Sequence, residues 1–321
     1  MEKLLITGDQ KLQGNVKISG SKNAAVAILP AAIITREKVR LHNLPDITDV
    51  RVLISILEDL GVAIRRRGRN SIELSSPGLR SYSPPYDMVK KLRASYYLMG
   101  SLLARFGRAE VPIPGGCDFG PRPIDQHLKG FSALGAEIDI EHGLVKLQAE
   151  KLRGAHIYLD VVSVGATINL MLAAAVAEGQ TIIENAAKEP EIVDTANFLN
   201  AMGASIKGAG TDVIRIEGAD SFCSVSHTII PDRIEAGTFM VAAVATDGEI
   251  VVEDVIPKHL EAITAKLREA GAEIGVEADQ IKVKRGPELL PVDVKTFVYP
   301  GFPTDLQPLV MTLLTAAEGT S

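Results

Sequence analysis

Apolar and polar positions along the chain repeat with a helical period, and they repeat as whole units. In one kind of helical segment, apolar residues recur every three or four positions and a glycine follows the last turn, as is typical of an amphipathic helix. Four segments follow this pattern and continue into strand-like residues: VRVLISILEDLGVAIRR, PIDQHLKGFSALGAEIDI, IVDTANFLNAMGASIKG and HLEAITAKLREAGAEIGV. Their glycines, at positions 61, 135, 203 and 271, are spaced by 74, 68 and 68 residues.

The other kind of helical segment is rich in Ala and Gly and apolar on nearly every face. We expect these helices to be buried inside a layer of sheets. Four of them run on into a strand: NAAVAILPAAIITREKVRLHN, RASYYLMGSLLARFGRAEVPI, VGATINLMLAAAVAEGQTIIEN and EAGTFMVAAVATDGEIVVED. The fifth is FPTDLQPLVMTLLTAAEGTS. In the last four, aligned glycines at positions 107, 179, 248 and 319 are 72, 69 and 71 residues apart. Two interleaved patterns with one period of about 70 residues predict a repeated unit.

Each unit is predicted to hold a buried helix, a strand, an amphipathic helix and a closing pair of strands, which makes the fold class α/β. The units begin near Lys22, Arg93, Ser163, Arg233 and Phe302. The fifth stops at AEGTS, where earlier units continue with a strand such as TIIEN or EIVVED. A unit that ends before its strand leaves a sheet edge uncovered. We therefore expect the C-terminal part of the protein to be missing from this chain.

The composition narrows the classes of protein. Apolar residues make up 46% and charged residues 23%, the balance of a soluble globular protein. The net charge of −6 argues against a nucleic-acid-coating surface. Arginines at positions 65–67 and 69 lie on a predicted hairpin, interpreted as a solvated tip with anion binding as the alternative. Two cysteines and no N-terminal signal pattern predict a cytoplasmic protein. The longest apolar run, residues 170–177, is too short for membrane insertion.

The buried helices begin with polar clusters that suit anions. Lys22 and Asn23 open the first, Arg93 the second, Ser163 the third, and Asp305 lies at the start of the fifth. A helix N-terminus offers unpaired N–H groups and a positive dipole end, so a point where several such ends meet is predicted to bind phosphates or carboxylates. No Walker A sequence and no strand-anchored G-x-G-x-x-G occurs, which disfavours a nucleotide-dependent kinase or a Rossmann enzyme. The six histidines show no metal-ligand spacing, so we expect no metal.

Each of these residues also has a purely structural interpretation. Lys22 suits a surface lysine beside an N-cap serine, and Arg93 suits an ion pair with a neighbouring carboxylate. Asp305 suits a helix cap, and Asp232 and Glu235 suit the first turn of the fourth buried helix. The sequence pattern by itself leaves both interpretations open.

The two cysteines lie in different surroundings. Cys223, in SFCSVSHTI, fits a half-buried strand position and is assigned no role. Cys117 lies in VPIPGGCDFGPRPID, a run of Pro and Gly that suits an exposed loop and gives an apolar thiol nothing to pack against. The residues alone leave the role of Cys117 open.

Seven motifs, in order along the chain, resemble the UDP-N-acetylglucosamine 1-carboxyvinyltransferase family of the EPSP synthase superfamily: GSKNAA, LRASYYLMG, PGGCDFGPRPID, SVGAT, ENAAKEPEIVDTANFL, PDRIEAGTF and FPTDLQ. The resemblance implies a two-lobed inside-out α/β barrel of six units. It implies a first lobe of residues 1–20 and 230–321 and a second lobe of residues 21–229 that carries a cysteine lid loop, residues 112–123. Since six units are expected, we expect about 100 residues to be absent from this chain. We expect little turnover from this chain alone.

The resemblance also implies a reaction. The enolpyruvyl group of phosphoenolpyruvate moves to the 3-hydroxyl of UDP-N-acetylglucosamine and phosphate is released, without a cofactor, as the first committed step of peptidoglycan synthesis. By the resemblance, Cys117 donates a proton to the enol carbon and is the site of covalent attack by the antibiotic fosfomycin. Asp305 takes the proton from the sugar hydroxyl. Lys22, Asn23 and Arg122 bind phosphoenolpyruvate.

A larger set of residues is implied to bind the sugar nucleotide. They are Arg93, Arg122, Pro123, Ile124, Asp125, Gln126, Ser163, Val164, Gly165 and Asp305. Some family members have a lysine just before VSVG where this chain has Val161, so that phosphate contact is lost.

Two other functions remain as alternatives. One is the related enolpyruvyl transferase of the shikimate pathway, 3-phosphoshikimate 1-carboxyvinyltransferase, which lacks a comparable cysteine loop. The other is a non-catalytic sugar-nucleotide-binding paralogue. The presence of Lys22, Cys117 and Asp305 together argues against the second, because a binding protein needs neither an acid nor a base.

Overall fold

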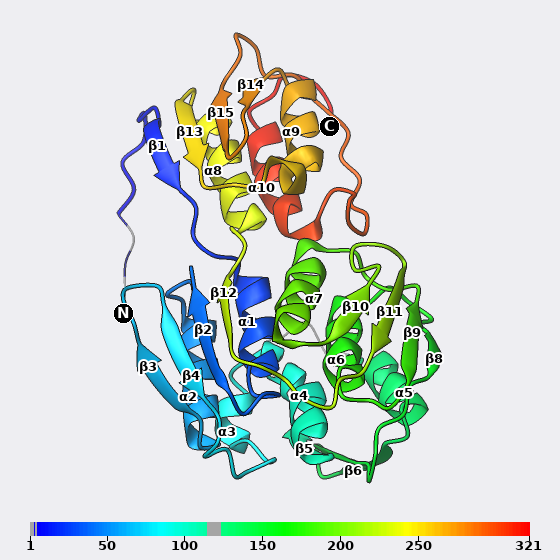
Figure 1. Cartoon of the computed structure of the whole chain (residues 1–321). Coiled ribbons are helices and arrows are strands. Elements are labelled where there is room, and N and C mark those ends of the chain that lie inside the picture. Colours follow the sequence, from blue (N-terminus) through cyan, green and yellow to red (C-terminus); the bar gives the residue numbers. More distant parts are fainter. Residues whose placement is uncertain (1–2, 4, 114–122) are drawn as a thin grey trace. The chain divides into compact units, whose positions relative to one another are not determined.

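The structure, a computed structural model, describes residue 3, residues 5–113 and residues 123–321. The chain divides into two compact units, each of which is described by itself: unit 1 comprises Met1–Ser19 and Pro231–Ser321, and unit 2 comprises Gly20–Ile230 (Figure 1). Among the described residues, none of the helices combines the length and the apolar character needed to cross a bilayer.

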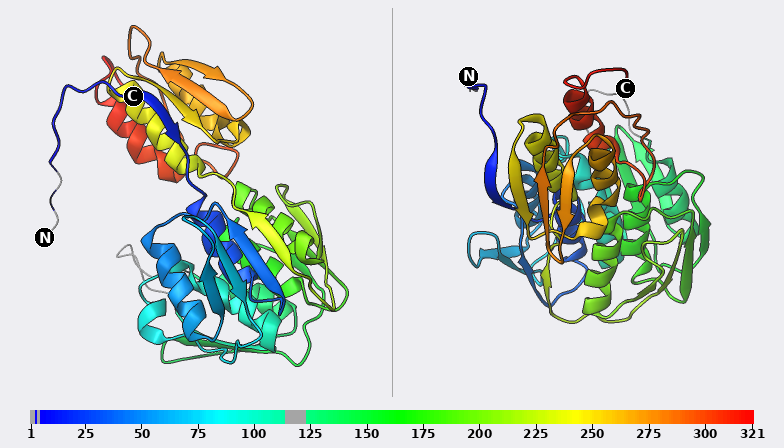
Figure 2. Two further views of the ribbon diagram at one scale, coloured as in Figure 1. Left: turned by 60° about the vertical axis from the view of Figure 1, so that its left-hand side comes forward. Right: turned by 90° about the horizontal axis from the view of Figure 1, so that it is seen from above.

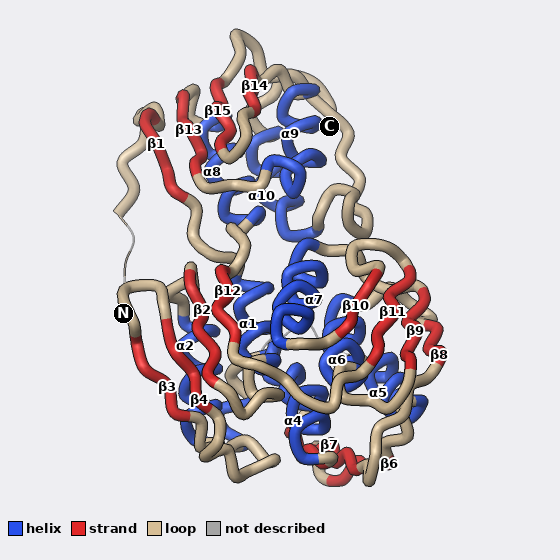
Figure 3. Tube along the Cα trace, in the orientation of Figure 1, coloured by secondary structure: helices blue, strands red, loops and turns tan. Residues whose placement is uncertain are grey.

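Unit 2 places its sheets outside and its apolar helices inside, as Figure 3 shows. Its helices are α1 (Lys22–Ala31), α2 (Thr48–Asp59), α3 (Tyr86–Val89), the 3₁₀ turn η1 (Arg93–Tyr96), α4 (Tyr97–Phe106), α5 (Asp125–Ala133), α6 (Val164–Ala174) and α7 (Pro190–Met202). Its strands are β2 (Lys38–His42), β3 (Ala63–Arg66), β4 (Ile72–Ser75), β5 (Arg108–Pro112), β6 (Glu137–Glu141), β7 (Leu144–Gln148), β8 (His156–Tyr158), β9 (Gln180–Glu184), β10 (Ser205–Lys207), β11 (Val213–Glu217) and β12 (Val225–Thr228).

The sheets repeat one strand order, which confirms the repeat predicted from the sequence. In unit 2, β12 runs parallel to β2, which continues antiparallel to β4 and β3. Strands β8, β9, β11 and β10 follow the same order and directions. The sheet β5-β7-β6 is antiparallel throughout its described strands. The glycines at positions 61, 135, 203 and 271 all have positive φ, between 91° and 122°, as expected just past a helix.

The helices predicted to be buried are buried in unit 2, whereas in unit 1 the prediction was wrong for α10 (Gln307–Leu314), in which Val310 and Leu313 are buried but Met311 and Thr312 are exposed. In α6 every residue from Gly165 to Ala174 is buried, and in α1 every residue from Ala24 to Ala31. Small residues permit this packing, because a side chain at Gly100 of α4 would lie 2.5 Å from the backbone oxygen of Asn169 in α6. A side chain at Gly130 of α5 would lie 2.3 Å from the side chain of Leu170. The close approach of α4, α5 and α6 therefore depends on glycine.

Unit 1 contains a further copy of the four-stranded sheet, β1-β13-β15-β14, with β1 parallel to β13. Its elements are β1 (Gln13–Lys17), α8 (Arg233–Ala245), β13 (Glu249–Glu253), η2 (Pro257–Leu260), α9 (Glu261–Glu269), β14 (Glu273–Val276), β15 (Gln280–Lys284), η3 (Thr304–Leu306) and α10 (Gln307–Leu314). Helix α8 packs on β13 and β15, and α10 packs on α8 (Figure 2). Met240, Val252 and Ile281 lie in the core of this unit.

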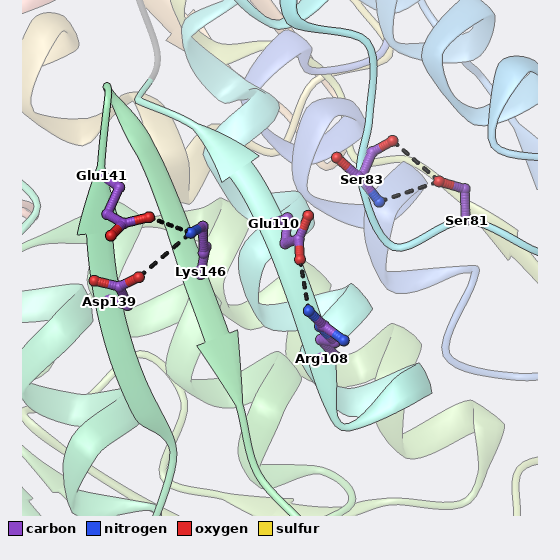
Figure 4. A network of polar contacts seen from close by, with 7 residues as sticks. All are labelled: Ser81, Ser83, Arg108, Glu110, Asp139, Glu141 and Lys146. Carbon is purple, nitrogen blue, oxygen red and sulfur yellow. Dashed lines mark hydrogen bonds and ion pairs between the residues drawn. The ribbon is translucent and has the colours of Figure 1, made fainter.

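The outward surface of the sheet β5-β7-β6 is polar. Figure 4 shows Lys146 of β7 between Glu141 and Asp139 of β6, at 2.6 and 3.4 Å, and Arg108 paired with Glu110 along β5 at 2.9 Å. Exposed pairs of this kind contribute little to stability. They mark a solvated face.

One local prediction was wrong. Cys223 is exposed and precedes β12 rather than lying in a strand, because pairing with β2 begins only at Val225. The Cys223 thiol contacts the backbone oxygen of Met202 at 3.2 Å.

Candidate active site

The first turns of α1, α2 and α7 meet in unit 2. Ser21 is the N-cap of α1, and its hydroxyl accepts a hydrogen bond from the backbone N–H of Ala24. The next residue, Lys22, pairs its ammonium with Asp49 in the first turn of α2 at 2.6 Å. Asn23 donates its side-chain amide to Glu191 in the first turn of α7 at 3.2 Å. Consecutive residues of α1 thus hold two other helix N-termini.

The first turns of α4, α5 and α6 also meet. Gly165, the second residue of α6, lies so close to Tyr96 and His127 that a side chain there would come within 2.9 Å of the Tyr96 hydroxyl and 3.1 Å of His127 Cε1. Tyr96 ends the turn η1 that leads into α4, and His127 lies in the first turn of α5. The rings of Tyr96 and His127 are in edge contact at 5.1 Å.

These two groups of helix ends adjoin each other. Helix α1 packs on α4 and α7, and α6 packs on α4, α5 and α7. Tyr97, at the start of α4, is buried; burial first, and then the adjacent Tyr96, hold its pKa well above the usual range. The charges of Glu191 and Arg93 both act on this phenol, in opposite directions. The N-terminal ends of α1, α2, α4, α5, α6 and α7 therefore form one surface, which we call the N-terminal face.

The loop before α6 is fixed to the first turn of α5. Gln126 is buried, its side-chain oxygen accepts the backbone N–H of Asp160 at 2.8 Å, and its amide nitrogen donates to Asp125 and Asp160 at 2.6 and 3.2 Å. Lys129 also binds Asp160, at 2.7 Å, and this contact first, then Gln126, lowers the pKa of the Asp160 carboxyl. The segment around Val161, whose side chain is exposed, is thereby held beside α5.

The start of α6 is suited to an anion. Ser163 is the N-cap, and its hydroxyl accepts the backbone N–H of Ala166 at 3.2 Å. The N–H groups of Val164 and Gly165 belong to the first turn, where a helix has no backbone acceptor for them. Together with the helix dipole, such groups favour a phosphate or carboxylate.

The N-terminal face brings together most of the site residues expected in unit 2. Lys22, Asn23, Arg93, Asp125, Gln126, Ser163, Val164 and Gly165 lie on it, and Pro123 and Ile124 directly precede α5. Among the described residues no carboxylate forms an ion pair with Arg93, whose side chain is exposed. Cys117 and Arg122 lie outside the described residues.

Asp305 belongs to unit 1. It lies in η3 with an exposed side chain, and neither η3 nor α10 has a side-chain cap, so Asp305 is not a helix cap. Asp232, in contrast, caps α8 by accepting the N–H groups of Ile234 and Glu235. Glu235 accepts the backbone N–H of Ser19 at 3.0 Å and so fixes the segment after β1 to α8.

Sequence reasoning missed four residues of this face. Asp49 and Glu191 were overlooked although each lies in the first turn of a helix, and His127 although it follows PIDQ directly. Asn169 is the clearest omission, because it is a polar residue inside the otherwise apolar run NLMLAAA. Within the described ranges, no three His, Cys, Asp or Glu side chains gather as metal ligands.

The sequence of this chain is similar to a known family and to named proteins. The sequence model of the family EPSP synthase (3-phosphoshikimate 1-carboxyvinyltransferase) matches residues 6–321. A protein of Caldanaerobacter subterraneus subsp. tengcongensis, UDP-N-acetylglucosamine 1-carboxyvinyltransferase 3, is 57% identical over 321 residues, which are 100% of this chain and 77% of that protein.

The chain belongs to the UDP-N-acetylglucosamine 1-carboxyvinyltransferases of the EPSP synthase family.

Further relatives agree with this membership. UDP-N-acetylglucosamine 1-carboxyvinyltransferase 2 of Bacillus subtilis is 57% identical over 323 residues, covering 100% of this chain and 75% of the relative. Among solved structures, the enolpyruvyl transferase NikO from Streptomyces tendae superposes with a TM-score of 0.85 at 26% identity, over 97% of this chain and 74% of NikO. EPSP synthase from Acinetobacter baumannii, at 19% identity and a TM-score of 0.72, shares the fold over 95% of this chain and 70% of that one. The EPSP synthase-like α/β fold expected from the sequence is confirmed.

Proposed function

We propose that this member of the family transfers the enolpyruvyl group of phosphoenolpyruvate to the 3-hydroxyl of UDP-N-acetylglucosamine and releases phosphate. The N-terminal face carries this proposal, because both substrates are anionic and the face gathers helix N-termini with Lys22 and Arg93. High-identity relatives named for this reaction support it. A role in peptidoglycan synthesis in the cytoplasm follows from the reaction as part of the same proposal.

The binding roles divide along the face. Lys22, Asn23 and Arg122 are proposed to bind phosphoenolpyruvate, which has a phosphate and a carboxylate for their donors. The first turn of α6, Ser163 to Gly165, is proposed to meet the diphosphate of the sugar nucleotide with Arg93. The start of α5, Pro123 to Gln126, is proposed to hold the uridine.

The chemistry requires an acid and a base. Cys117 is proposed to give a proton to the terminal enol carbon while the sugar oxygen bonds to the adjacent carbon and Asp305 takes the hydroxyl proton. The tetrahedral intermediate then returns a proton from its methyl group to the Cys117 thiolate, and the C–O bond to phosphate breaks, which forms the enol ether of the product. Atoms balance without an oxidant, a reductant or a cofactor.

The division into lobes is part of the proposal. The chain passes from one unit to the other between residues 19 and 20 and between residues 230 and 231. We propose these two crossings as hinges of a lobe closure that excludes water from the intermediate.

Covalent labelling tests the function. Intact-mass analysis after incubation with fosfomycin is expected to show one adduct, formed faster when UDP-N-acetylglucosamine is present. Cys117→Ser should gain none, whereas Cys223→Ser, which removes the other and exposed cysteine, should label like the wild type. An adduct on Cys223, or none on either thiol, would contradict the proposal.

Ligand choice separates the alternatives. UDP-N-acetylglucosamine is expected to raise the melting temperature, because a ligand that binds only the folded state stabilises it. Stabilisation by shikimate 3-phosphate instead would favour the shikimate-pathway activity. Stabilisation by UDP-N-acetylglucosamine with no labelling of Cys117 would favour a non-catalytic binding protein.

A further inference from the structure

A buried amide lies where α4, α5 and α6 meet. The side chain of Asn169 in α6 is fully buried, and it contacts α4, the turn η1 before α4, and the first turn of α5. Its oxygen accepts the backbone N–H of Gly100 in α4 at 2.9 Å, and its nitrogen donates to the backbone oxygen of Tyr96 at 3.0 Å. The same nitrogen contacts Nδ1 of His127 in α5 at 2.9 Å. One amide therefore connects three helices of the N-terminal face.

The two backbone contacts determine the positions of the oxygen and the nitrogen in the Asn169 amide. A flipped Asn169 would set its NH₂ group against the N–H of Gly100 and its oxygen against the oxygen of Tyr96, which is repulsive at both ends. The group facing His127 is therefore the NH₂, which only donates. Nδ1 of His127 must accept this bond and so carries no proton. A neutral His127 then has its proton on Nε2.

The surroundings keep the ring neutral. Burial, acting first, lowers the pKa of His127 to about 4; the carboxylate of Asp125 opposes this shift and the guanidinium of Arg93 adds to it. An imidazolium would also point an Nδ1 proton at the NH₂ of Asn169. At neutral pH the ring is an uncharged donor through Nε2–H.

The ring extends from the amide toward the N-terminal end of α6. Asn169 and Gly165 lie four residues apart, on one side of the helix. In the His127 ring, Nδ1 lies next to Asn169, and Cε1 lies next to Gly165, which is one helical turn nearer the N-terminus of α6. Nε2 is bonded to Cε1 and therefore comes next along this edge of the ring. No described residue pairs with Nε2, and the buried, unpaired side-chain polar atoms of the described residues are Thr181 Oγ1 and Thr264 Oγ1. The side chain of His127 is only 4% exposed, and its Nε2–H has no acceptor among the described residues.

We propose that Asn169 is a positioning residue of the sugar-nucleotide site, which acts through His127 by holding it as the Nε2–H tautomer, directed at an acceptor oxygen of UDP-N-acetylglucosamine. The inference rests on the proposed function for the identity of that ligand. The link between Asn169 and the His127 ring is independent of the proposed function.

The wild-type chain gives the first test. In ¹⁵N-detected NMR of the imidazole nitrogens, with the His127 signals assigned by their loss in His127→Gln, the ring is expected as the Nε2–H tautomer at pH 7. The Nε2 signal should move on titration with UDP-N-acetylglucosamine. An Nδ1–H tautomer in the wild type would overturn the proposal whether or not any variant folds.

Asn169→Asp gives the second test, because it replaces the donor by an acceptor of nearly equal size. The carboxylate should draw the proton of the neutral ring from Nε2 to Nδ1 of His127, so that Nε2 no longer donates. At a pH where the ring stays neutral, the affinity for UDP-N-acetylglucosamine should fall about tenfold, the loss of one well-placed hydrogen bond. Asn200→Asp is the matched control, since Asn200 makes two hydrogen bonds to the backbone of Ile206, away from the face. It should leave the tautomer and the affinity unchanged.

The outcomes separate the two claims. An unchanged tautomer in Asn169→Asp, or a changed tautomer with wild-type affinity, would overturn the positioning role. A wild-type chain that keeps the Nε2–H tautomer but shows neither heat of binding nor an Nε2 shift with UDP-N-acetylglucosamine would refute the proposed function and, with it, the ligand named here.

Discussion

The side-chain amide of Asn23 donates to the carboxylate of Glu191 at 3.2 Å, across 168 positions of sequence. This bond joins the first turn of α1 to the first turn of α7, and Lys22 beside it joins α1 to α2 through Asp49. The residues that a substrate phosphate would meet are thus fixed by polar contacts among helix N-termini. Such contacts hold donors in place before the ligand arrives.

Glu191 should be important for the stability of unit 2. Its side chain is buried, so Glu191→Ala leaves the amide of Asn23 without this acceptor and should lower the free energy of unfolding by about 1–3 kcal/mol in urea titrations. Glu191→Gln keeps an acceptor oxygen and should lose less. The control is Asp139→Ala on the exposed surface of β6, expected within about 0.5 kcal/mol of the wild type. Equal effects at the two positions would refute the structural role.

Gly165 should tolerate no side chain. In Gly165→Ala the new methyl group meets the Tyr96 hydroxyl at 2.9 Å and His127 Cε1 at 3.1 Å, so either these two rings or α6 must move. We expect a loss of about 1–3 kcal/mol in stability and weaker binding of UDP-N-acetylglucosamine by titration calorimetry. Gly275→Ala, where the nearest atom is 3.9 Å away, should change neither. Wild-type affinity in Gly165→Ala would count against the role of this helix end.

Glu73 should make the free energy of unfolding fall more steeply as the pH is lowered into the acid range. Its side chain is nearly buried between Arg67 and Arg40, whose hydrogen bonds lower its pKa to about 2. Since this folded value lies below the usual value of about 4.3, the ionised carboxylate stabilises the fold above that pH and the contribution disappears as the pH falls toward 2. The difference in urea midpoint between wild type and Glu73→Gln should therefore shrink over this interval. A difference that stays constant with pH would contradict the assignment.

His127 should make the free energy of unfolding depend on pH over a different pH range. Its folded pKa of about 4 lies below the usual value of about 6.5, so the unfolded chain binds more protons in between, and stability falls as the pH drops from 6.5 to 4. The full loss is on the order of 3 kcal/mol. His127→Gln should show a flatter profile in this interval by thermal or urea unfolding. The same slope in both proteins would show that His127 does not titrate as argued.

Much of the architecture could be predicted from the sequence, because helix period, glycine at helix ends and the repeat are local signals. The helix expected at Lys22 begins there, with Ser21 as its cap, and the hairpin expected around the arginines is β3 and β4. The second buried helix differs in one detail, since Arg93 opens a 3₁₀ turn and α4 starts at Tyr97.

The contacts within the site could not be predicted in the same way. Asn23 with Glu191, and His127 with Asn169, are pairs from different repeats, and their meeting depends on how whole units pack. A polar residue in an apolar helix, as Asn169 is, signals a buried partner without naming it. Cys223 was predicted to lie in a strand because it comes just before the strand-like residues of β12, and the sequence does not mark Val225 as the residue where pairing begins.

Mapping of UDP-N-acetylglucosamine onto the backbone amides by ¹H–¹⁵N NMR tests the central claim most directly. The account predicts that the largest shifts fall at the first turns of the helices, at Asn23, Gln126, Gly165 and Glu191, and that the C-terminal ends of the same helices, at Ala31, Ala133, Ala174 and Met202, stay unchanged. Shifts concentrated at those C-terminal ends, or on the outer surfaces of the sheets, would contradict it.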